Sequence, residues 1–535
     1  MSRTAQKDGG SPNTSQVVVK ALERLGISIA FGIPGMWSLP IYDALCDSKI
    51  RHILVRHEQF AAYAADGYAR ASGKPGFCLG TAGPGAVNIA AGIAVPFRDH
   101  SPVIAVTGQV PTFEQGKGWV EDLDLQAIFS PVTKSTAQIS DPANAYETII
   151  SAYLSSIEGC PGPSHVSIPG DLQRAPSRMR DYSPLPSKPE PDPSTIDQVM
   201  DALASSRAPL IISGWGAILS GSSEGVLRLA ETLPAPVTTS YMGRGIIAED
   251  NPLSLGTAGR RGTKEANAAL SRCDLLLALG CRLTNMTVAG AKLTCKVVQV
   301  DIDEKNFSSY ASVRVKSDIS LFLDAILPKI RSHIKEPNPL LSSSASQLPE
   351  KGKATAFAKA IASFDDAIFS LDIGQHTIWM MHALKIKRPR SVILSGNLSA
   401  MGYSLPAAIG AKLASPGRRV IVVIGDGGFQ MTAPELSTIR ENDLDISICV
   451  FNNRTLGLIK QQQEVVYGRT LGVNYTGPPD YVKLAQAYGI KGLRVESPLE
   501  LKEALQMADE PRVFDIPIPG EEGVEMSRPR ILDNQ

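Results

Sequence analysis

Short runs of apolar residues alternate with longer amphipathic or alanine-rich stretches along most of the chain. Two of the strongest runs occupy residues 420–424 and 446–451, and a helical pattern lies between them. Apolar runs joined by a helix are typical of buried parallel strands in a βαβ unit. Because this alternation recurs in three blocks, the sequence predicts an α/β fold with three doubly wound parallel-sheet domains.

Two proline- and serine-rich stretches, 181–194 and 334–353, have the composition of linkers. They predict a first domain at 14–180, a central domain at 195–333 and a third domain at 354–520. The polar segment 1–13 lacks the apolar core of a signal peptide, so we expect a disordered tail, and 521–535 forms a second tail.

Composition narrows the class of protein. Apolar residues make up 43% of the 535-residue chain and charged residues 20%, which is ordinary for a soluble globular protein. The net charge of zero gives no indication of nucleic acid or an anionic membrane as a partner. Seven cysteines without a CxxC pair predict free thiols in the cytoplasm, not a zinc site. The uncharged run 76–97 is rich in glycine, so we expect a strand, a turn and a buried helix there and no membrane span.

Polar residues follow both of the strongest predicted strands. Gly425-Asp426-Gly427-Gly428 ends the first, and Asn453 follows the second. In parallel sheets, ligands lie beyond the carboxyl ends of the strands. Oxygen donors suit Mg²⁺, and a helix expected to begin near Thr432 would offer N–H groups to an anion. These residues predict Mg²⁺ holding a diphosphate, although Gly-Asp-Gly alone is also a common turn.

Gly-Asp-Gly, followed after 24 residues by Asn-Asn, resembles the motif of thiamine-diphosphate (ThDP) enzymes. Four further stretches resemble the large subunit of acetolactate synthase: 40–45, 107–111, 252–256 and 407–412. The similarity extends over about residues 14–520. The resemblance implies a pyrimidine-binding first domain, a central domain similar to FAD- or nucleotide-binding domains, and a diphosphate-binding third domain.

Glu58 is the candidate catalytic residue. It stands where an apolar strand gives way to an alanine-rich helix, as in the strand-Glu-helix motif of the family. The resemblance implies that its carboxylic acid shares a proton with N1′ of the cofactor's pyrimidine, a role favoured by an apolar setting. The simpler alternative is a glutamate that stabilises the first helical turn through the helix dipole.

The same resemblance assigns the remaining site residues. It implies that Mg²⁺ is held by Asp426, Asn453 and the Thr455 carbonyl, and that Met401 is the wedge between the two rings of the bent cofactor. The cofactor-binding set comprises Ile33, Pro34, Gly35, Thr81, Pro84, Asn88, Gly374, Gln375, His376, Ser399, Met401, Gly425, Asp426, Gly427, Gly428, Asn453, Thr455, Leu456, Gly457 and Leu458. Taken singly, several of these have bland explanations: Pro34-Gly35 is an ordinary turn, and a methionine before a helix is usually core packing.

By this resemblance the chain is a transferase or lyase that decarboxylates a pyruvate-like 2-oxo acid and joins the resulting enamine to a second carbonyl, in branched-chain amino acid biosynthesis. A 2-oxo acid decarboxylase, a 2-hydroxyacyl lyase and an inactive cofactor-binding regulator remain alternatives, with a Rossmann dehydrogenase as a further one. Glu58 argues against the regulator, because a binding module needs no proton relay. The resemblance also implies a homodimer or homotetramer, since the site draws on two blocks, and a regulatory subunit is possible.

Several positions depart from the family pattern. Val120-Glu121-Asp122 replaces Phe-Gln-Glu, Met36-Trp37 replaces two small residues, and Gln462 stands where acetolactate synthases carry a tryptophan. Carboxylates near a carboxylate substrate would repel it, so the donor and acceptor stay open. In the central block, 282–286 keeps only the first arginine of the FAD-binding run, and Gly214-Trp215-Gly216 is too short for a dinucleotide fingerprint. FAD therefore remains an open question.

Overall fold

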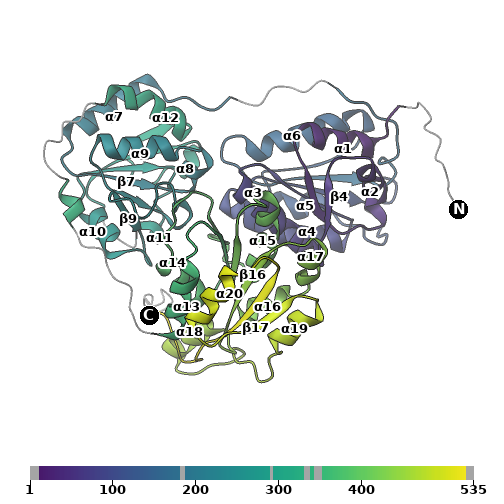
Figure 1. Ribbon diagram of the computed structural model, residues 1–535. Coiled ribbons are helices and arrows are strands. Elements are labelled where there is room, and N and C mark those ends of the chain that lie inside the picture. The colour runs from purple at the N-terminus through teal and green to yellow at the C-terminus, as the bar shows by residue number, and fades with distance from the viewer. Residues whose placement is uncertain (1–10, 181–186, 289–292, 331–337, 343–351, 526–535) are drawn as a thin grey trace. The chain divides into compact units, whose positions relative to one another are not determined.

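The computed structural model describes residues 11–180, 187–288, 293–330, 338–342 and 352–525 of two compact units, residues 1–186 and 187–535 (Figure 1). Within these ranges the strands form three six-stranded parallel sheets, one in the first unit and two in the second. The α/β prediction is therefore confirmed. Among the helices described, none has both the length and the apolar character that crossing a bilayer requires.

The sheet of the first unit has the order β2-β1-β3-β4-β6-β5. Its strands are β1 (Ile29–Gly32), β2 (Arg51–Leu54), β3 (Gly76–Gly80), β4 (Val103–Gln109), β5 (Ser135–Gln138) and β6 (Ser164–Pro169). One face packs against α1 (Thr14–Arg24), α2 (Leu39–Cys46) and α6 (Ala145–Ile157). The other face carries α3 (Glu58–Ser72), α4 (Pro84–Asp99) and the short α5 (Leu125–Phe129). The run 76–97 is the predicted strand, turn and helix.

Helices α3 and α4 pack closely because small residues face each other. A Cβ on Gly92 would lie only 2.6 Å from the Cβ of Ala62, so the two backbones approach at this point. Further along both helices, the guanidinium of Arg70 donates to the carboxylates of Asp66 and Asp99 at 2.9 Å each. All three side chains are buried, so the charges must satisfy one another. The ion cluster thereby fixes the two helices that begin at Glu58 and Pro84.

The first sheet of the second unit has the order β12-β11-β10-β7-β8-β9. Its strands are β7 (Pro209–Ser213), β8 (Val237–Thr239), β9 (Ser254–Thr257), β10 (Leu275–Leu279), β11 (Lys296–Asp301) and β12 (Val313–Lys316). One face packs against α7 (Pro193–Ser205), α8 (Trp215–Leu219), α9 (Ser223–Thr232) and α12 (Ile319–Ile326). The other face packs against α10 (Lys264–Arg272) and α11 (Asn285–Val288).

The second sheet of this unit has the order β14-β13-β15-β16-β18-β17. Its strands are β13 (Ile368–Leu371), β14 (Val392–Ile393), β15 (Val420–Gly425), β16 (Ile446–Asn452), β17 (Lys491–Arg494) and β18 (Arg512–Pro517). One face packs against α13 (Lys353–Ala362), α14 (Gln375–Ala383) and α20 (Pro498–Gln506). The remaining helices are α15 (Ser404–Ala414), α16 (Asp426–Thr432), α17 (Glu435–Glu441), α18 (Gly457–Tyr467) and α19 (Tyr481–Ala487).

A buried ion pair ties the two sheets of the second unit together. Arg244 pairs with Glu249 at 2.5 Å and donates to the carbonyls of Met381 and Leu384 at the carboxyl end of α14. The Glu249 carboxylate in turn accepts the N–H of Ile386 at 3.0 Å. Because both charged side chains are almost inaccessible to water, they hold the end of α14 firmly against the neighbouring sheet.

Parts of the predicted linkers and tail are packed. Asn338 donates to the Pro209 carbonyl at 3.0 Å and Leu340 is buried. In the segment predicted as a C-terminal tail, the Glu522 carboxylate accepts the N–H of Ala354 at the start of α13. Residues 1–10, 181–186, 331–337, 343–351 and 526–535 of the predicted tails and linkers lie outside the described residues. The domain limits remain predictions.

Each sheet has a topological switch point: successive strands are added first on one side of the starting strand and later on its other side. This switch lies between β1 and β3 in the first unit, between β7 and β10 in the central sheet, and between β13 and β15 in the last sheet. Loops that leave neighbouring strands at a switch point diverge, and they form the crevice in which open α/β sheets bind ligands. The predicted site residues follow β1, β2 and β3 in the first unit and β13, β14, β15 and β16 in the second.

Candidate functional site

The first half of the site surrounds Glu58, the first residue of α3, which follows β2. His57 caps this helix by accepting the N–H of Gln59 on its Nδ1 at 3.2 Å. The half-buried Glu58 carboxylate accepts a hydrogen bond from Nδ2 of Asn88 at 2.9 Å. The carboxylate therefore has a fixed partner, and the prediction that Glu58 begins a helix is correct.

Glycines bring the loops after β1 and β3 against each other beside this carboxylate. A Cβ on Gly85 would lie 3.3 Å from Oε1 of Glu58 and 2.9 Å from Cγ2 of Thr81. A Cβ on Gly35 would lie 2.5 Å from Cβ of Thr81, so only glycine fits there. The structure therefore gathers Glu58, Asn88, Gly35, Thr81 and Gly85; Ile33 lies in the same loop, and Pro84 begins α4.

The Trp37 indole, one of the two departures after Gly35, packs against the backbone of the first unit. A Cβ on Gly170 would lie 2.7 Å from Cε3 of Trp37, so the ring rests on this backbone. Gln173 donates to the Trp37 carbonyl at 2.6 Å. Met36, by contrast, is exposed, and of the two residues it is the one available to a ligand.

The second half of the site lies at the carboxyl ends of β13, β15 and β16. These strands are neighbours, and Gly425 pairs in register with Phe451. This arrangement confirms that Asp426 and Asn453 follow adjacent parallel strands. The helix after β15, however, begins at Asp426 and not near Thr432. The predicted start was too late because Gly427 and Gly428 have low helix propensity. In the structure both are buried, and tertiary packing holds them in the helix.

Asp426 has an unsatisfied carboxylate oxygen. Its Oδ1 accepts the N–H of Gly427 at 2.9 Å, whereas its buried Oδ2 has no hydrogen-bond partner among the described residues. Burial raises the pKa of this carboxyl to about 6, against the opposing effect of hydrogen bonds from the Gly427 and Arg454 backbone. A buried oxygen without a partner is costly, so it indicates a ligand such as a cation.

Asn453 connects the loops after β16 and β13. Its Nδ2 donates to Oε1 of Gln375 at 3.3 Å, and its Oδ1 accepts the N–H of Thr455 at 3.3 Å. Thr455 is buried and donates through its hydroxyl to the Val473 carbonyl at 2.7 Å. A Cβ on Gly457 would lie 2.1 Å from Oε1 of Gln375, so the start of α18 touches the loop after β13. Leu456 and Leu458 flank Gly457 at the start of this helix.

His376 presents a second unsatisfied atom at this edge. The ring is buried, its Nε2 has no partner among the described residues, and burial lowers its pKa to about 4. A Cβ on Gly425 would lie 3.2 Å from Cε1 of His376, which places the ring beside the residue before Asp426. A neutral imidazole near the first turn of α14, whose N–H groups are available, suits contact with a phosphate.

These residues fit a magnesium diphosphate. The orphaned Asp426 oxygen and the Asn453 carboxamide are hard oxygen donors, and the His376 ring lies beside Gly425, the residue before Asp426. Asp426, Asn453 and the Thr455 carbonyl would hold Mg²⁺, and Gly374, Gln375 and His376 would hold the diphosphate. In the described part of the chain no three His, Cys, Asp or Glu side chains converge on a common point.

The loop of Ser399 and Met401 precedes α15. Ser399 has φ of 58°, a left-handed conformation that glycine adopts without strain. Its N–H donates to the Ser395 carbonyl at 3.2 Å, and the N–H of Ala400 donates to the Ser395 hydroxyl at 3.1 Å. Met401 is half-buried at the end of this turn.

The glycines of the central sheet's switch point are used for packing. A Cβ on Gly214 would lie 2.2 Å from the Gly280 carbonyl oxygen, and a Cβ on Gly216 would lie 2.8 Å from Cα of Gly280. Gly216 also donates its N–H to that carbonyl at 3.1 Å. The two loops therefore pack on each other, which explains Gly214-Trp215-Gly216 without a dinucleotide.

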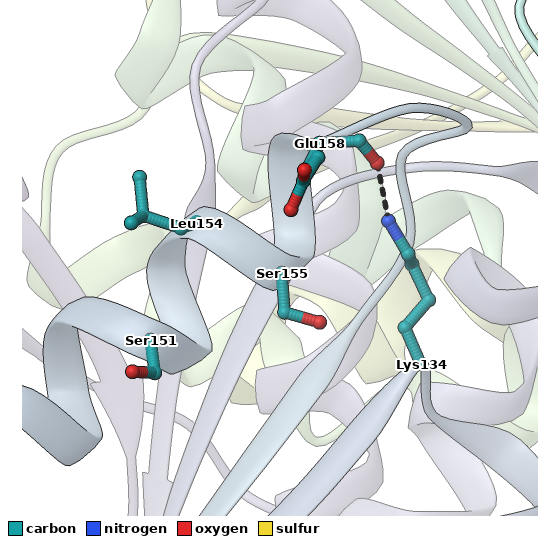
Figure 2. Close-up of a pocket in the computed structure, with 5 residues that line it drawn as sticks. All are labelled: Lys134, Ser151, Leu154, Ser155 and Glu158. Carbon is teal, nitrogen blue, oxygen red and sulfur yellow. Dashed lines mark hydrogen bonds between the residues drawn. The ribbon is translucent and has the colours of Figure 1, made fainter. Parts of the chain in front are cut away.

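One surface pocket lies away from these residues. It is lined by Lys134, Ser151, Leu154, Ser155 and Glu158, at the end of α6 and beside β5 (Figure 2). Lys134 is the only positively charged side chain among these five residues, and its ammonium group donates to the backbone carbonyl of Glu158 at 2.6 Å. None of the predicted site residues lines it.

Asp372 is a buried carboxylate that the sequence analysis did not assign to the site. It ends the β13 segment just before Gly374, and its side chain accepts hydrogen bonds from Gly402 and Ser404. The signal was present, because an aspartate directly after an apolar strand is the pattern that singled out Asp426.

Three consecutive regions of the chain match thiamine pyrophosphate enzyme domains. Residues 12–128 match the N-terminal TPP binding domain, 196–326 the central domain and 372–516 the C-terminal TPP binding domain. A probable acetolactate synthase large subunit from Methanocaldococcus jannaschii is 40% identical, over 96% of this chain and 93% of the relative. The acetolactate synthase large subunit of Lactococcus lactis is 34% identical, over 95% of this chain and 93% of the relative. With these matches and this geometry, the chain belongs to the family of thiamine pyrophosphate enzymes.

Proposed function

We propose that the protein is a ThDP- and Mg²⁺-dependent enzyme that decarboxylates a pyruvate-like 2-oxo acid and joins the remaining fragment to a second carbonyl compound. The observation that carries the proposal is the buried Asp426 oxygen at the β13–β15 switch point, which has no partner among the described residues; in the first unit, Glu58 is anchored by Asn88. Relatives named acetolactate synthase large subunit, similar over most of the chain, support this choice of reaction.

ThDP supplies, when bound, the carbanion chemistry that reacts with the carbonyl carbon of a 2-oxo acid. Glu58 holds a proton and exchanges it with the pyrimidine ring, and Asn88 keeps the carboxyl group in one orientation. Asp426 and Asn453 bind the metal ion, and His376 contacts the diphosphate. Met401 would contact the rings of the cofactor, so that it would contribute to the rate by positioning them.

The assembly follows from where these residues lie in the chain. Glu58 belongs to the first compact unit and Asp426 to the second. In our proposal the two halves meet across two copies of the chain, which gives an obligate homodimer or a homotetramer. The relatives are called large subunits, so a regulatory subunit is a further candidate partner. A cytoplasmic location and a role in branched-chain amino acid biosynthesis belong to the same proposal.

The experiment is incubation of the purified protein with ThDP, Mg²⁺ and pyruvate. Acetoin after acid treatment supports formation of acetolactate, and acetaldehyde indicates decarboxylation alone. Glu58→Gln should retain ThDP binding and lose most turnover. Normal turnover in this variant would contradict the assignment, and a failure of the wild-type protein to bind ThDP in calorimetry would contradict the family function for this chain.

Glu121 favours a second candidate, decarboxylation or ligation to an uncharged aldehyde. A Cβ on Gly83, the residue before α4, would lie 2.8 Å from Cβ of Glu121, so the loop of Glu121 contacts the start of the helix that carries Asn88. Its Oε2 is buried without a hydrogen-bond partner among the described residues. A negative charge here would repel a second 2-oxo carboxylate. Glu121→Gln should therefore raise the ratio of acetolactate to acetaldehyde.

A further inference from the structure

Asp372 carries a buried carboxylate at the end of β13, next to the predicted diphosphate loop. Its Oδ1 accepts the N–H of Ile373 at 3.0 Å and the N–H of Gly402 at 2.9 Å. Its Oδ2 accepts both the N–H and the hydroxyl of Ser404 at 2.9 Å. The side chain is fully buried, which raises its pKa, and the four donated hydrogen bonds oppose that shift. All four contacts are donors, the surroundings that an ionised carboxylate requires.

These bonds reach the segment that carries Met401. Gly402 and Ser404 lie 30 and 32 residues from Asp372 in the sequence, directly after Met401. Gly402 has φ of 80°, so the backbone turns sharply at this point. Ser370 adds a further contact between the same segments, since its hydroxyl donates to the Ser404 carbonyl at 2.7 Å. The conformation of the turn after Met401 thus depends on a carboxylate supplied by β13.

Asp372 also contacts two other loops of the site. A Cβ on Gly428 would lie 2.8 Å from Oδ1 of Asp372, so the first turn of α16 packs directly on the carboxylate. The Asp372 carbonyl accepts the Thr377 hydroxyl, and Thr377 lies in the first turn of α14. One residue therefore touches the loop of Gln375 and His376, the turn after Met401 and the helix that begins at Asp426.

We infer that Asp372 is a positioning residue that sets Met401 against the cofactor, through its bonds to Gly402 and Ser404. This inference rests on the proposed function. Three of the four side-chain bonds hold the turn after Met401, and the fourth holds the N–H of Ile373. The first turn of α14 is held by the backbone carbonyl of Asp372, which substitution of the side chain retains. The carboxylate thus governs the fit of the ring portion of ThDP more than that of its diphosphate.

The test compares the wild-type protein with Asp372→Asn in binding of ThDP and of inorganic pyrophosphate, both with Mg²⁺, by calorimetry. The amide presents a donor where the carboxylate presented an acceptor, so at least one backbone N–H loses its partner. We expect ThDP affinity to fall by roughly tenfold or more and pyrophosphate affinity to change much less. Peptides that contain Gly402 and Ser404 should also exchange their amide hydrogens faster with deuterium.

A double-mutant cycle links the effect to Met401. If Asp372 acts through that side chain, Asp372→Asn should weaken ThDP binding much less in a Met401→Ala background than in the wild-type background. Asp318→Asn is the matched control: Asp318 is a buried carboxylate that accepts the N–H of Ser320 at 3.0 Å, in the other sheet of the same unit. It should lower thermal stability without changing ThDP affinity.

Three results would overturn the inference: unchanged ThDP affinity in Asp372→Asn, equal losses for ThDP and pyrophosphate, or additive effects in the cycle. Should Asp372→Asn not fold, Ser404→Ala removes only the hydroxyl bond, and it should weaken ThDP in the same direction by a smaller factor. An unchanged affinity in that variant would also contradict the inference. A wild-type protein that binds no ThDP would instead refute the proposed function.

Discussion

Replacement of Asn88 by alanine removes the hydrogen-bond donor that holds Glu58. The bond from Nδ2 to the Glu58 carboxylate is 2.9 Å long, and it crosses from α4 to α3. Hydrogen bonds to charged groups contribute about 1.5–3 kcal/mol. Since about 1.4 kcal/mol corresponds to a factor of ten in rate, Asn88→Ala should slow proton transfer by Glu58 roughly 10- to 150-fold. The residues that we propose bind the diphosphate lie in the second unit, so ThDP affinity should fall far less.

The assay is exchange of the C2 hydrogen of bound ThDP with deuterium, followed by acid quench and NMR, beside calorimetric titration of the cofactor. Val87→Ala is the control, because Val87 is the neighbouring residue of α4 and its side chain is exposed. Exchange at the wild-type rate in Asn88→Ala would refute the reasoning. So would a slow rate that is explained entirely by lost ThDP binding.

Three further substitutions have defined outcomes. His165 is buried between the hydroxyls of Thr107 and Thr136, and burial lowers its pKa from 6.5 to about 3. The unfolded chain therefore binds a proton at this histidine below pH 6.5 while the folded first unit does not, so the free energy of unfolding should fall by up to about 1.4 kcal/mol for each pH unit below 6.5. In urea titrations at several pH values, His165→Gln should flatten this slope. Asp426→Asn should abolish the Mg²⁺-dependent affinity for ThDP in calorimetry. It should also raise the melting temperature of the cofactor-free protein at pH 7.5, because a carboxylate with a raised pKa destabilises the fold where it is ionised, above about pH 6. A lower melting temperature in this variant would contradict the reasoning. Arg244→Ala leaves the Glu249 charge buried and unpaired, which should cost about 3–5 kcal/mol in calorimetric unfolding of the second unit; Arg260→Ala, an exposed arginine nearby in sequence, should change it little.

The sequence was most informative where local pattern and topology coincide. Asp426 and Asn453 each follow an apolar run, and parallel pairing of β15 with β16 brings them to one edge of the sheet. Glu58 begins a helix because a strand ends just before it. These placements depend on residues close in sequence, which is why they could be predicted.

Contacts between distant segments could not be predicted. The four hydrogen bonds of Asp372 depend on how the turn after Met401 folds back on β13, and no spacing in the sequence indicates it. The start of α16 was misplaced because helix propensity disfavours Gly427 and Gly428, whereas packing on Asp372 requires a small residue at 428. Likewise, proline-rich composition concealed that Leu340 is buried against the central sheet.

The glycine contacts beside Glu58 limit how this enzyme could acquire new substrates. Gly35 and Gly85 leave no room for even a methyl group against Thr81, so these two positions tolerate no enlargement. Variation must then come from other side chains of this region, such as the exposed Met36 and Glu121, which lies against Gly83. Directed evolution of this chain should therefore vary those positions, because larger residues at Gly35 or Gly85 would clash with Thr81 and disrupt the site.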